Sequence, residues 1–105
     1  MSEHCIKIII PVTGEFGTEQ EQIKISALGK ALDMVLESGH EGEFDGDEYG
    51  DGMATLYLYG PDAERLYAKI SPFLARAELP AQSYALLRFG PPDDPNVKTR
   101  KIPLS

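Results

Sequence analysis

Residues 6–12 read Ile-Lys-Ile-Ile-Ile-Pro-Val, a nearly continuous run of β-branched residues close to the start of the chain. β-branched side chains favour strands. A strand that is apolar along its length, instead of at alternate positions only, is buried on both of its faces. We therefore predict a central strand around which the rest of the chain is built. The neighbouring Cys5 is expected to be a small buried residue of that strand, not a catalytic thiol.

Two later segments have the apolar spacing of amphipathic helices. The first begins at a capping-box pair, Thr18 and Glu21, and is predicted to run to about residue 38. The second is predicted over about 63–77, after Asp62, whose carboxylate can cap the first turn. Pro72 lies inside the second segment and is expected to kink or divide it, because proline lacks the N–H of the helical hydrogen bond.

The other β patterns are placed around these helices. Further strands are predicted at 41–45, 53–59 and 83–89, with turns at 46–52 and 90–95 and a basic tail at 97–104 that is a candidate edge strand. The order β-α-β-β-α-β predicts a ferredoxin-like α+β sandwich, in which an antiparallel sheet carries both helices on one face. The other face would stay open for a homodimer or for the tail to cover. The aromatic residues expected on it are Tyr57, Tyr59, Tyr84 and Phe89.

Length and charge restrict the function further. A chain of 105 residues is one domain, with a core at about 5–90 and a turn-rich linker and basic tail at 91–105. The formal net charge of −7 disfavours nucleic acid and anionic membrane as partners, because phosphate groups bind Lys and Arg. One cysteine allows no intrachain disulfide. The start of the chain does not resemble a signal peptide, and no apolar run is long enough for a membrane span, so a cytoplasmic location is expected.

The segment 37–51 is strongly acidic, and no Lys or Arg occurs between Lys30 and Arg65. It is interpreted either as an acidic binding surface or as a solvated hairpin that Phe44 and Tyr49 anchor. Arg88 is a lone cation in a predicted strand, and we expect it to pair with a carboxylate of residues 43–51 or with Asp62. The candidate binding residues are Glu43, Phe44, Asp45, Asp47, Glu48, Tyr49, Asp51 and Arg88.

Metal and catalytic patterns are incomplete. A calcium loop that starts at Asp45 would have Tyr49 at its fifth position and Leu56 where a bidentate Glu is required, so no tight calcium site is predicted. His40 beside Glu41 could form a proton-transfer pair, but a surface histidine at a helix end is favoured. No catalytic residue, metal or cofactor is assigned.

Three phrases of the chain resemble those of a small bacterial domain family that has no established activity. They are Gly42-Glu-Phe-Asp-Gly46 followed by Glu48 and Gly50, Leu58-Tyr-Gly-Pro-Asp-Ala63, and Arg88-Phe-Gly-Pro-Pro92; Glu15-Phe-Gly-Thr-Glu19 fits as well. The resemblance covers nearly the whole chain. It implies a common fold, in which the acidic segment and the two Gly-Pro turns form one recurring unit, and it implies no chemistry.

The leading functional hypothesis is a non-enzymatic interaction module, similar in role to immunity or inhibitor proteins. Its acidic segment and open sheet would bind a basic protein, because acidic surfaces speed the encounter with basic partners and aromatic residues anchor them. One alternative is a small-ligand binder or enzyme that uses the carboxylates near Asp45 with His40 or Arg88. Another is a structural domain that associates with itself.

Overall fold

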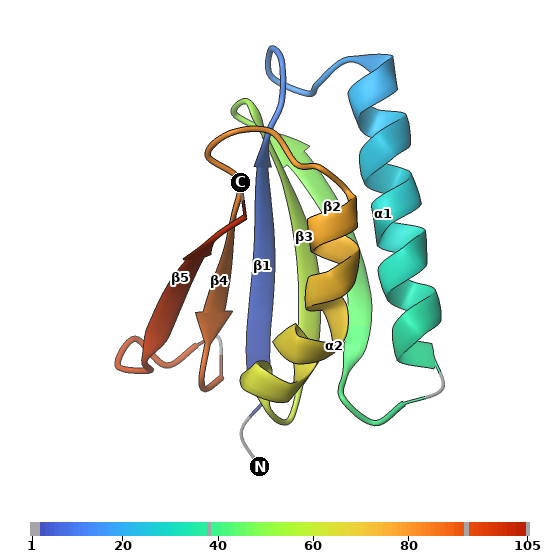
Figure 1. Ribbon diagram of the computed structural model, residues 1–105. Helices are drawn as coiled ribbons and strands as arrows, with labels where there is room; N and C mark the ends of the chain where they lie inside the picture. Colours follow the sequence, from blue (N-terminus) through green and yellow to red (C-terminus); the bar gives the residue numbers. More distant parts are fainter. Residues whose placement is uncertain (1–2, 38, 92, 105) are drawn as a thin grey trace.

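A computed structural model describes residues 3–37, 39–91 and 93–104 of the chain. The elements follow one another in the order β-α-β-β-α-β-β. Their bounds are β1 His4–Pro11, α1 Glu19–Glu37, β2 Glu43–Gly50, β3 Met53–Gly60, α2 Ala63–Arg76, β4 Tyr84–Arg88 and β5 Thr99–Pro103. All five strands form one antiparallel sheet in the spatial order β2-β3-β1-β4-β5, with the helices packed against it (Figure 1).

The apolar run forms the central strand, as predicted. β1 lies between β3 and β4, and its Cys5, Ile6, Ile8, Ile9 and Ile10 are all buried. Burial on both faces follows because Ile6, Ile8 and Ile10 point toward the helices, whereas Cys5 and Ile9 point to the other side, where side chains of β3 and β4 surround them. Burial also raises the pKa of the Cys5 thiol.

Both helices cover the same face of the sheet. Their buried residues join those of β1, β3 and β4 in one hydrophobic core; Leu32 of α1 and Leu66 of α2 are fully buried in it. Helix α1 lies along β2, and α2 lies over the middle of the sheet (Figure 1). The predicted α+β architecture with two helices and an antiparallel sheet is therefore confirmed.

The start of α1 is the predicted capping box. The Glu21 N–H donates to the Thr18 hydroxyl at 3.1 Å, and the Thr18 N–H donates to the Glu21 carboxylate at 2.8 Å. Thr13 also donates its N–H to this carboxylate. These backbone hydrogen bonds, first from Thr18 and then from Thr13, lower the pKa of Glu21.

Pro72 does not divide the second helix, contrary to one expectation. Helix α2 continues through it to Arg76. Pro72 and Ala68 are both exposed, so water can reach the Ala68 carbonyl that the proline leaves without its usual N–H donor.

Neither helix of the described residues is long and apolar enough to cross a membrane.

Two expectations about the sheet need correction. The ferredoxin-like order β-α-β-β-α-β is incomplete: the tail, named as a candidate edge strand, pairs with β4 as β5, so the sheet has five strands, the chain has seven elements, and the topology is not that of a ferredoxin. The short strand at 41–45 and the turn at 46–52 are also wrong. Residues 43–50 form one edge strand, and only Asp51 and Gly52 form the turn.

Candidate functional site

Most of the acidic segment is strand β2 of a β-hairpin, which continues to Gly50 through the residues expected to form the turn. Gly50 pairs with Met53, so Asp51 and Gly52 are the two turn residues, and both have positive φ, at 55° and 78°. Positive φ at both positions is typical of the type I′ turn that an Asp-Gly pair favours. The pairing of β2 with β3 shifts between Phe44 and Asp47, at a bulge that contains Gly46 with a φ of 97°.

The two aromatic residues of this strand point toward the helices. Phe44 and Tyr49 pack against the hydrophobic core, as the predicted anchors of the acidic segment. Phe44 lies directly under Gly29 of α1, where an added Cβ would be 3.0 Å from the Phe44 Cζ. They are therefore poorly placed to contact a partner, and burial raises the pKa of the Tyr49 phenol.

The acidic residues of β2 are divided between the two faces of the strand. Glu43 pairs with Tyr59 and Glu48 with Thr55, so both acids point away from the helices. Asp47 is on the helix side, where it lines a shallow depression with Lys30 and Tyr49. Asp51 is exposed in the turn. The segment therefore does not form one acidic surface.

Neither helix covers the opposite face of the sheet, which we call the uncovered face. Its middle is formed by half-buried Tyr57 and Tyr59 of β3, by Ile9 and the half-buried Lys7 of β1, and by half-buried Tyr84 and Leu86 of β4. Three of the four aromatic residues expected on this face are therefore there. Tyrosines that cluster with apolar side chains on an exposed face are typical of protein-binding surfaces.

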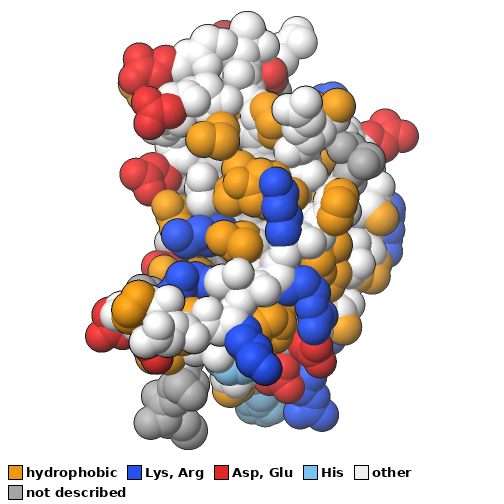
Figure 2. Space-filling model, turned by 90° about the vertical axis from the view of Figure 1, so that its left-hand side faces the viewer, with side chains coloured by type: hydrophobic (Ala, Val, Ile, Leu, Met, Phe, Trp, Pro, Cys, Tyr) orange, Lys and Arg blue, Asp and Glu red, His pale blue; other side chains and the backbone are white. Residues whose placement is uncertain are grey.

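Charge changes sign across the uncovered face. The strand pairings give three rows: Glu43–Tyr59–Cys5–Arg88–Thr99, Asp45–Tyr57–Lys7–Leu86–Lys101 and Glu48–Thr55–Ile9–Tyr84–Pro103, with Asp45 placed by the bulge opposite Tyr57. Each row begins with an acid on β2. We call Glu43, Asp45 and Glu48 the acidic border, and Lys101, which is exposed on the edge strand β5, the basic border. Seen from the β5 side, Lys and Arg side chains lie among hydrophobic ones in the middle of the view (Figure 2).

The tyrosines of this face are in contact with charged neighbours. The Tyr57 hydroxyl donates to the Glu48 carboxylate at 2.7 Å, which together with burial raises the pKa of Tyr57 to about 12. The Lys7 ammonium lies 5.9 Å from the Tyr57 ring centroid, and the Lys101 ammonium lies 4.1 Å from that of Tyr84. These contacts hold the rings in place on the face.

Arg88 does not pair with the acidic segment, so that prediction is wrong. Its guanidinium donates to the backbone carbonyls of Asp94 at 2.9 Å and Pro91 at 3.5 Å. The described residues contain one ion pair, which joins Arg100 to Glu64. Arg88 is three strands away from β2, beside Cys5, and it holds the 91–94 turn against the end of β4.

His40 and Glu41 lie outside the uncovered face. They line a shallow depression with Asp62, Arg65 and Lys69 at the start of α2. His40 is exposed, as expected for a surface histidine. Within residues 3–37, 39–91 and 93–104, no three His, Cys, Asp or Glu side chains are grouped so that they could hold a metal ion.

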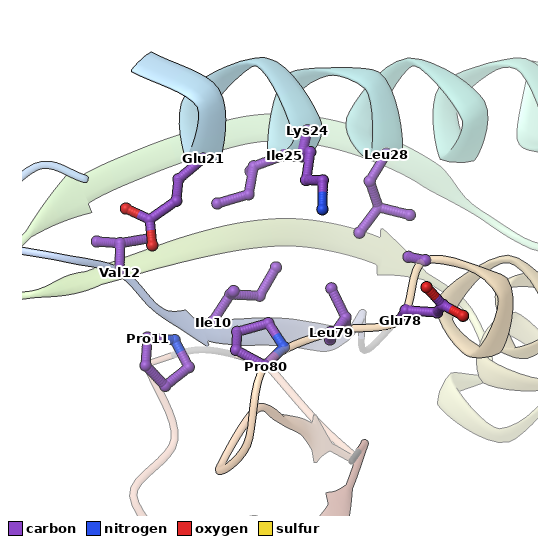
Figure 3. Close-up of a pocket in the computed structure, with 11 residues that line it drawn as sticks. Ile10, Pro11, Val12, Glu21, Lys24, Ile25, Leu28, Glu78, Leu79 and Pro80 are labelled. Carbon is purple, nitrogen blue, oxygen red and sulfur yellow. The ribbon is translucent and has the colours of Figure 1, made fainter. Parts of the chain in front are cut away.

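A separate small cavity lies between the start of α1 and the segment after α2 (Figure 3). Its volume is about 240 Å³, and its walls are mainly apolar, from Ile10, Ile25, Leu28, Leu79 and Pro80. Ligand pockets usually measure roughly 300–1,000 Å³. None of the predicted site residues lines it, and the carboxylate of Glu21 at its rim is engaged in the capping box.

Phe89 was expected on the uncovered face but lies on the helix side. It is five positions from Tyr84, an odd number, so alternation along a strand places the two rings on opposite faces. Its ring packs edge-on against His4, with centroids 5.7 Å apart, and the Arg100 guanidinium lies 5.3 Å from its centroid.

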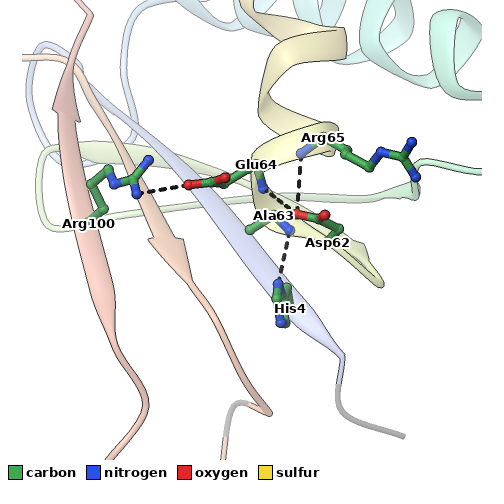
Figure 4. Close-up of polar contacts among 6 residues, drawn as sticks. All are labelled: His4, Asp62, Ala63, Glu64, Arg65 and Arg100. Carbon is green, nitrogen blue, oxygen red and sulfur yellow. Dashed lines mark hydrogen bonds and ion pairs between the residues drawn. The ribbon is translucent and has the colours of Figure 1, made fainter.

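His4 and Asp62 together cap the start of α2 (Figure 4). The Asp62 carboxylate accepts from the N–H groups of Glu64 and Arg65, as predicted for a capping residue. The second cap was not predicted, because its two residues are far apart in the chain: the Ala63 N–H donates to Nδ1 of His4 at 2.9 Å. His4 therefore has a structural role, because it links the start of β1 to the start of α2.

Comparisons of the chain with protein-family models, with curated proteins and with solved structures find no match.

Proposed function

We propose that the chain is a cytoplasmic protein-binding module without catalytic activity, which takes its partner on the uncovered face in the manner of immunity or inhibitor proteins. One observation carries this proposal. Tyr57, Tyr59, Tyr84 and Leu86 lie half-buried on the two strands that flank β1, and neither helix packs over them. Tyrosine supplies contact area at a low cost in side-chain entropy, and it is enriched where proteins bind one another.

The acidic border supports a partner that is basic at the matching edge. Glu43, Asp45 and Glu48 are all exposed along one edge of the aromatic patch. Charges at the rim of an interface raise the association rate more than the affinity. The expected partner surface is therefore apolar at its centre and basic along one side. The sequence-based hypothesis placed a basic protein on the acidic segment and the open sheet; the proposal keeps a basic contact surface on the partner and restricts the site to the uncovered face of the sheet.

A small-ligand or enzymatic role has less support. The carboxylates of residues 43–51 point to both faces of an edge strand, so they do not converge on one reacting atom. Arg88 and His40 lie at other places in the fold. The resemblance to a bacterial domain family stays a prediction, and it would be consistent with either role.

Affinity capture from the source cell tests the proposal. The bait variant Tyr84→Ala removes an aromatic side chain from the uncovered face, and Met34→Ala removes an exposed hydrophobic side chain from α1. We expect Tyr84→Ala to lose at least about tenfold in affinity for the captured protein, measured with both proteins purified, and Met34→Ala to bind normally. Equal binding by both variants would show that the face is not the binding surface.

A further inference from the structure

We infer that a second copy of this chain occupies the uncovered face, in a two-fold symmetric dimer that sets the acidic border of each copy against the basic border of the other. The inference rests on the proposed function and names the partner. The required partner surface is apolar at its centre and basic along one edge. The chain presents such a surface itself, because the same face ends in the exposed Lys101 on β5.

The two borders are too far apart to neutralise each other within one copy. Strands β2 and β5 are the two edges of the sheet, four strand spacings apart, or about 19 Å at about 4.8 Å each. This separation is about twice the Debye length at physiological ionic strength, so the attraction between exposed charges across the face is largely screened. Both borders are therefore available to a partner.

Charge selects one of the two symmetric arrangements of two stacked sheets. A two-fold axis that runs across the strands sets β2 over β2 and brings Asp45 against Asp45 of the second copy. An axis along the strands sets β2 over β5, so that Asp45 meets Lys101 of the second copy, and the contact occurs twice because the interface is isologous. Stacked sheets keep their strands within about 30° of each other, which is compatible with this axis.

Lys7 lies on the central strand, close to the proposed axis, where two like charges would meet. Its ammonium leans toward Tyr57 on the β3 side instead of standing over β1. The axis reverses this direction in the second copy, so the two ammonium groups lean apart. The tyrosines of each copy then face the β4 side of the other, where Leu86 and Tyr84 complete an apolar centre.

The size of the face sets the strength of the dimer. Five strands of about six residues give roughly 24 by 20 Å, or about 500 Å² for each copy and about 1,000 Å² for the pair. This value is at the lower end for specific interfaces, where complexes are weak or transient. We therefore expect a dimer that dissociates on dilution, with a dissociation constant in the micromolar range.

Charge reversal at the two borders, followed by mixing, tests the arrangement. Asp45→Lys and Lys101→Glu each place like charges opposite one another at both ends of the dimer. Each variant alone is expected to raise the dissociation constant about tenfold or more in sedimentation equilibrium. An equimolar mixture of the two variants is expected to recover dimers, because both ends of the mixed dimer again carry opposite charges. Asp33→Lys and Lys69→Glu make the same charge changes at exposed positions on the helices and should leave the constant unchanged.

Each outcome decides the inference. Recovery in the mixture, with unchanged helix controls, supports it. A dimer that neither border variant weakens, or one that mixing does not restore, overturns it. A chain that stays monomeric at millimolar concentration also overturns the inference. The proposed function would remain supported in that case if Tyr84→Ala weakens the binding of a captured protein that is not a second copy of the chain.

Discussion

Replacing Gly29 by alanine sets two effects of opposite sign against each other. Alanine in a helix interior is favoured over glycine by about 1 kcal/mol. The new Cβ would, however, lie 3.0 Å from Cζ and 3.3 Å from Cε2 of Phe44, closer than carbon atoms normally approach. Phe44 is partly buried against the core, so its ring must give way by a few tenths of an ångström to admit the new methyl group. Overpacking of this kind costs about 1–3 kcal/mol.

We therefore expect Gly29→Ala to lower the free energy of unfolding by about 1 kcal/mol, and the melting temperature by roughly 4–8 °C. Urea unfolding followed by circular dichroism measures the change. The partner variant Phe44→Leu removes the ring, and in that background Gly29→Ala should become stabilising by about 1 kcal/mol. A gain in stability from Gly29→Ala in the wild-type background would refute the close packing of α1 on the acidic strand.

Three further predictions concern the polar contacts. His4→Ala removes the acceptor for the Ala63 N–H and should cost about 1–2 kcal/mol in urea unfolding, with partial recovery in His4→Asn, whose side chain retains an acceptor. Asp62→Ala should cost a similar amount, about 0.5–2 kcal/mol, because two N–H groups of α2 lose their cap; no loss in either variant would contradict the double cap. The hydrogen bond to Glu48 raises the pKa of Tyr57 to about 12, so it contributes stability below pH 10 that disappears as the pH rises through 12. In an ultraviolet titration, the midpoint of Tyr57 ionisation should be lower in Glu48→Gln than in the wild type. An unchanged midpoint would disprove the contact.

The sequence predicted the core of the fold well because hydrophobic periodicity reports burial. The run at 6–10 was recognised as the central strand, and among the described residues β1 is the strand with buried side chains on both of its faces. The capping box at Thr18 and the cap at Asp62 were also recognised, because both depend on contacts within a few residues. Local signals of this kind need no knowledge of the rest of the structure.

The second half of the acidic strand, residues 46–50, was mistaken for part of a turn for a physical reason. Its alternation is interrupted by the bulge at Gly46, which shifts the side-chain phase between Phe44 and Asp47. The correct signal was the Asp51-Gly52 pair, which is a strong short-range mark of a two-residue hairpin turn. Placing the turn there would have made residues 43–50 a strand and would have divided the acids between two faces.

The partners of long-range contacts were the least predictable part of the candidate site. Arg88 was expected to need a carboxylate, but carbonyls of the turn that follows it accept its N–H groups. The basic border depends on β5 joining the sheet beside β4, which places Lys101 over Tyr84. The position of Lys101 could not be predicted from the residues near it in sequence, because it is set by strand pairing.

Hydroxyl-radical footprinting inside the source cell is the most direct test of the uncovered face as a binding surface. Tyr57, Tyr59 and Tyr84 report on this face, and the half-buried Tyr67 of α2 is the internal reference on the helix side. Compared with the dilute purified chain, we predict that oxidation of the three sheet tyrosines falls several-fold in the cell relative to Tyr67. An unchanged ratio would mean that the face stays exposed to water in the cell, and it would contradict the proposal.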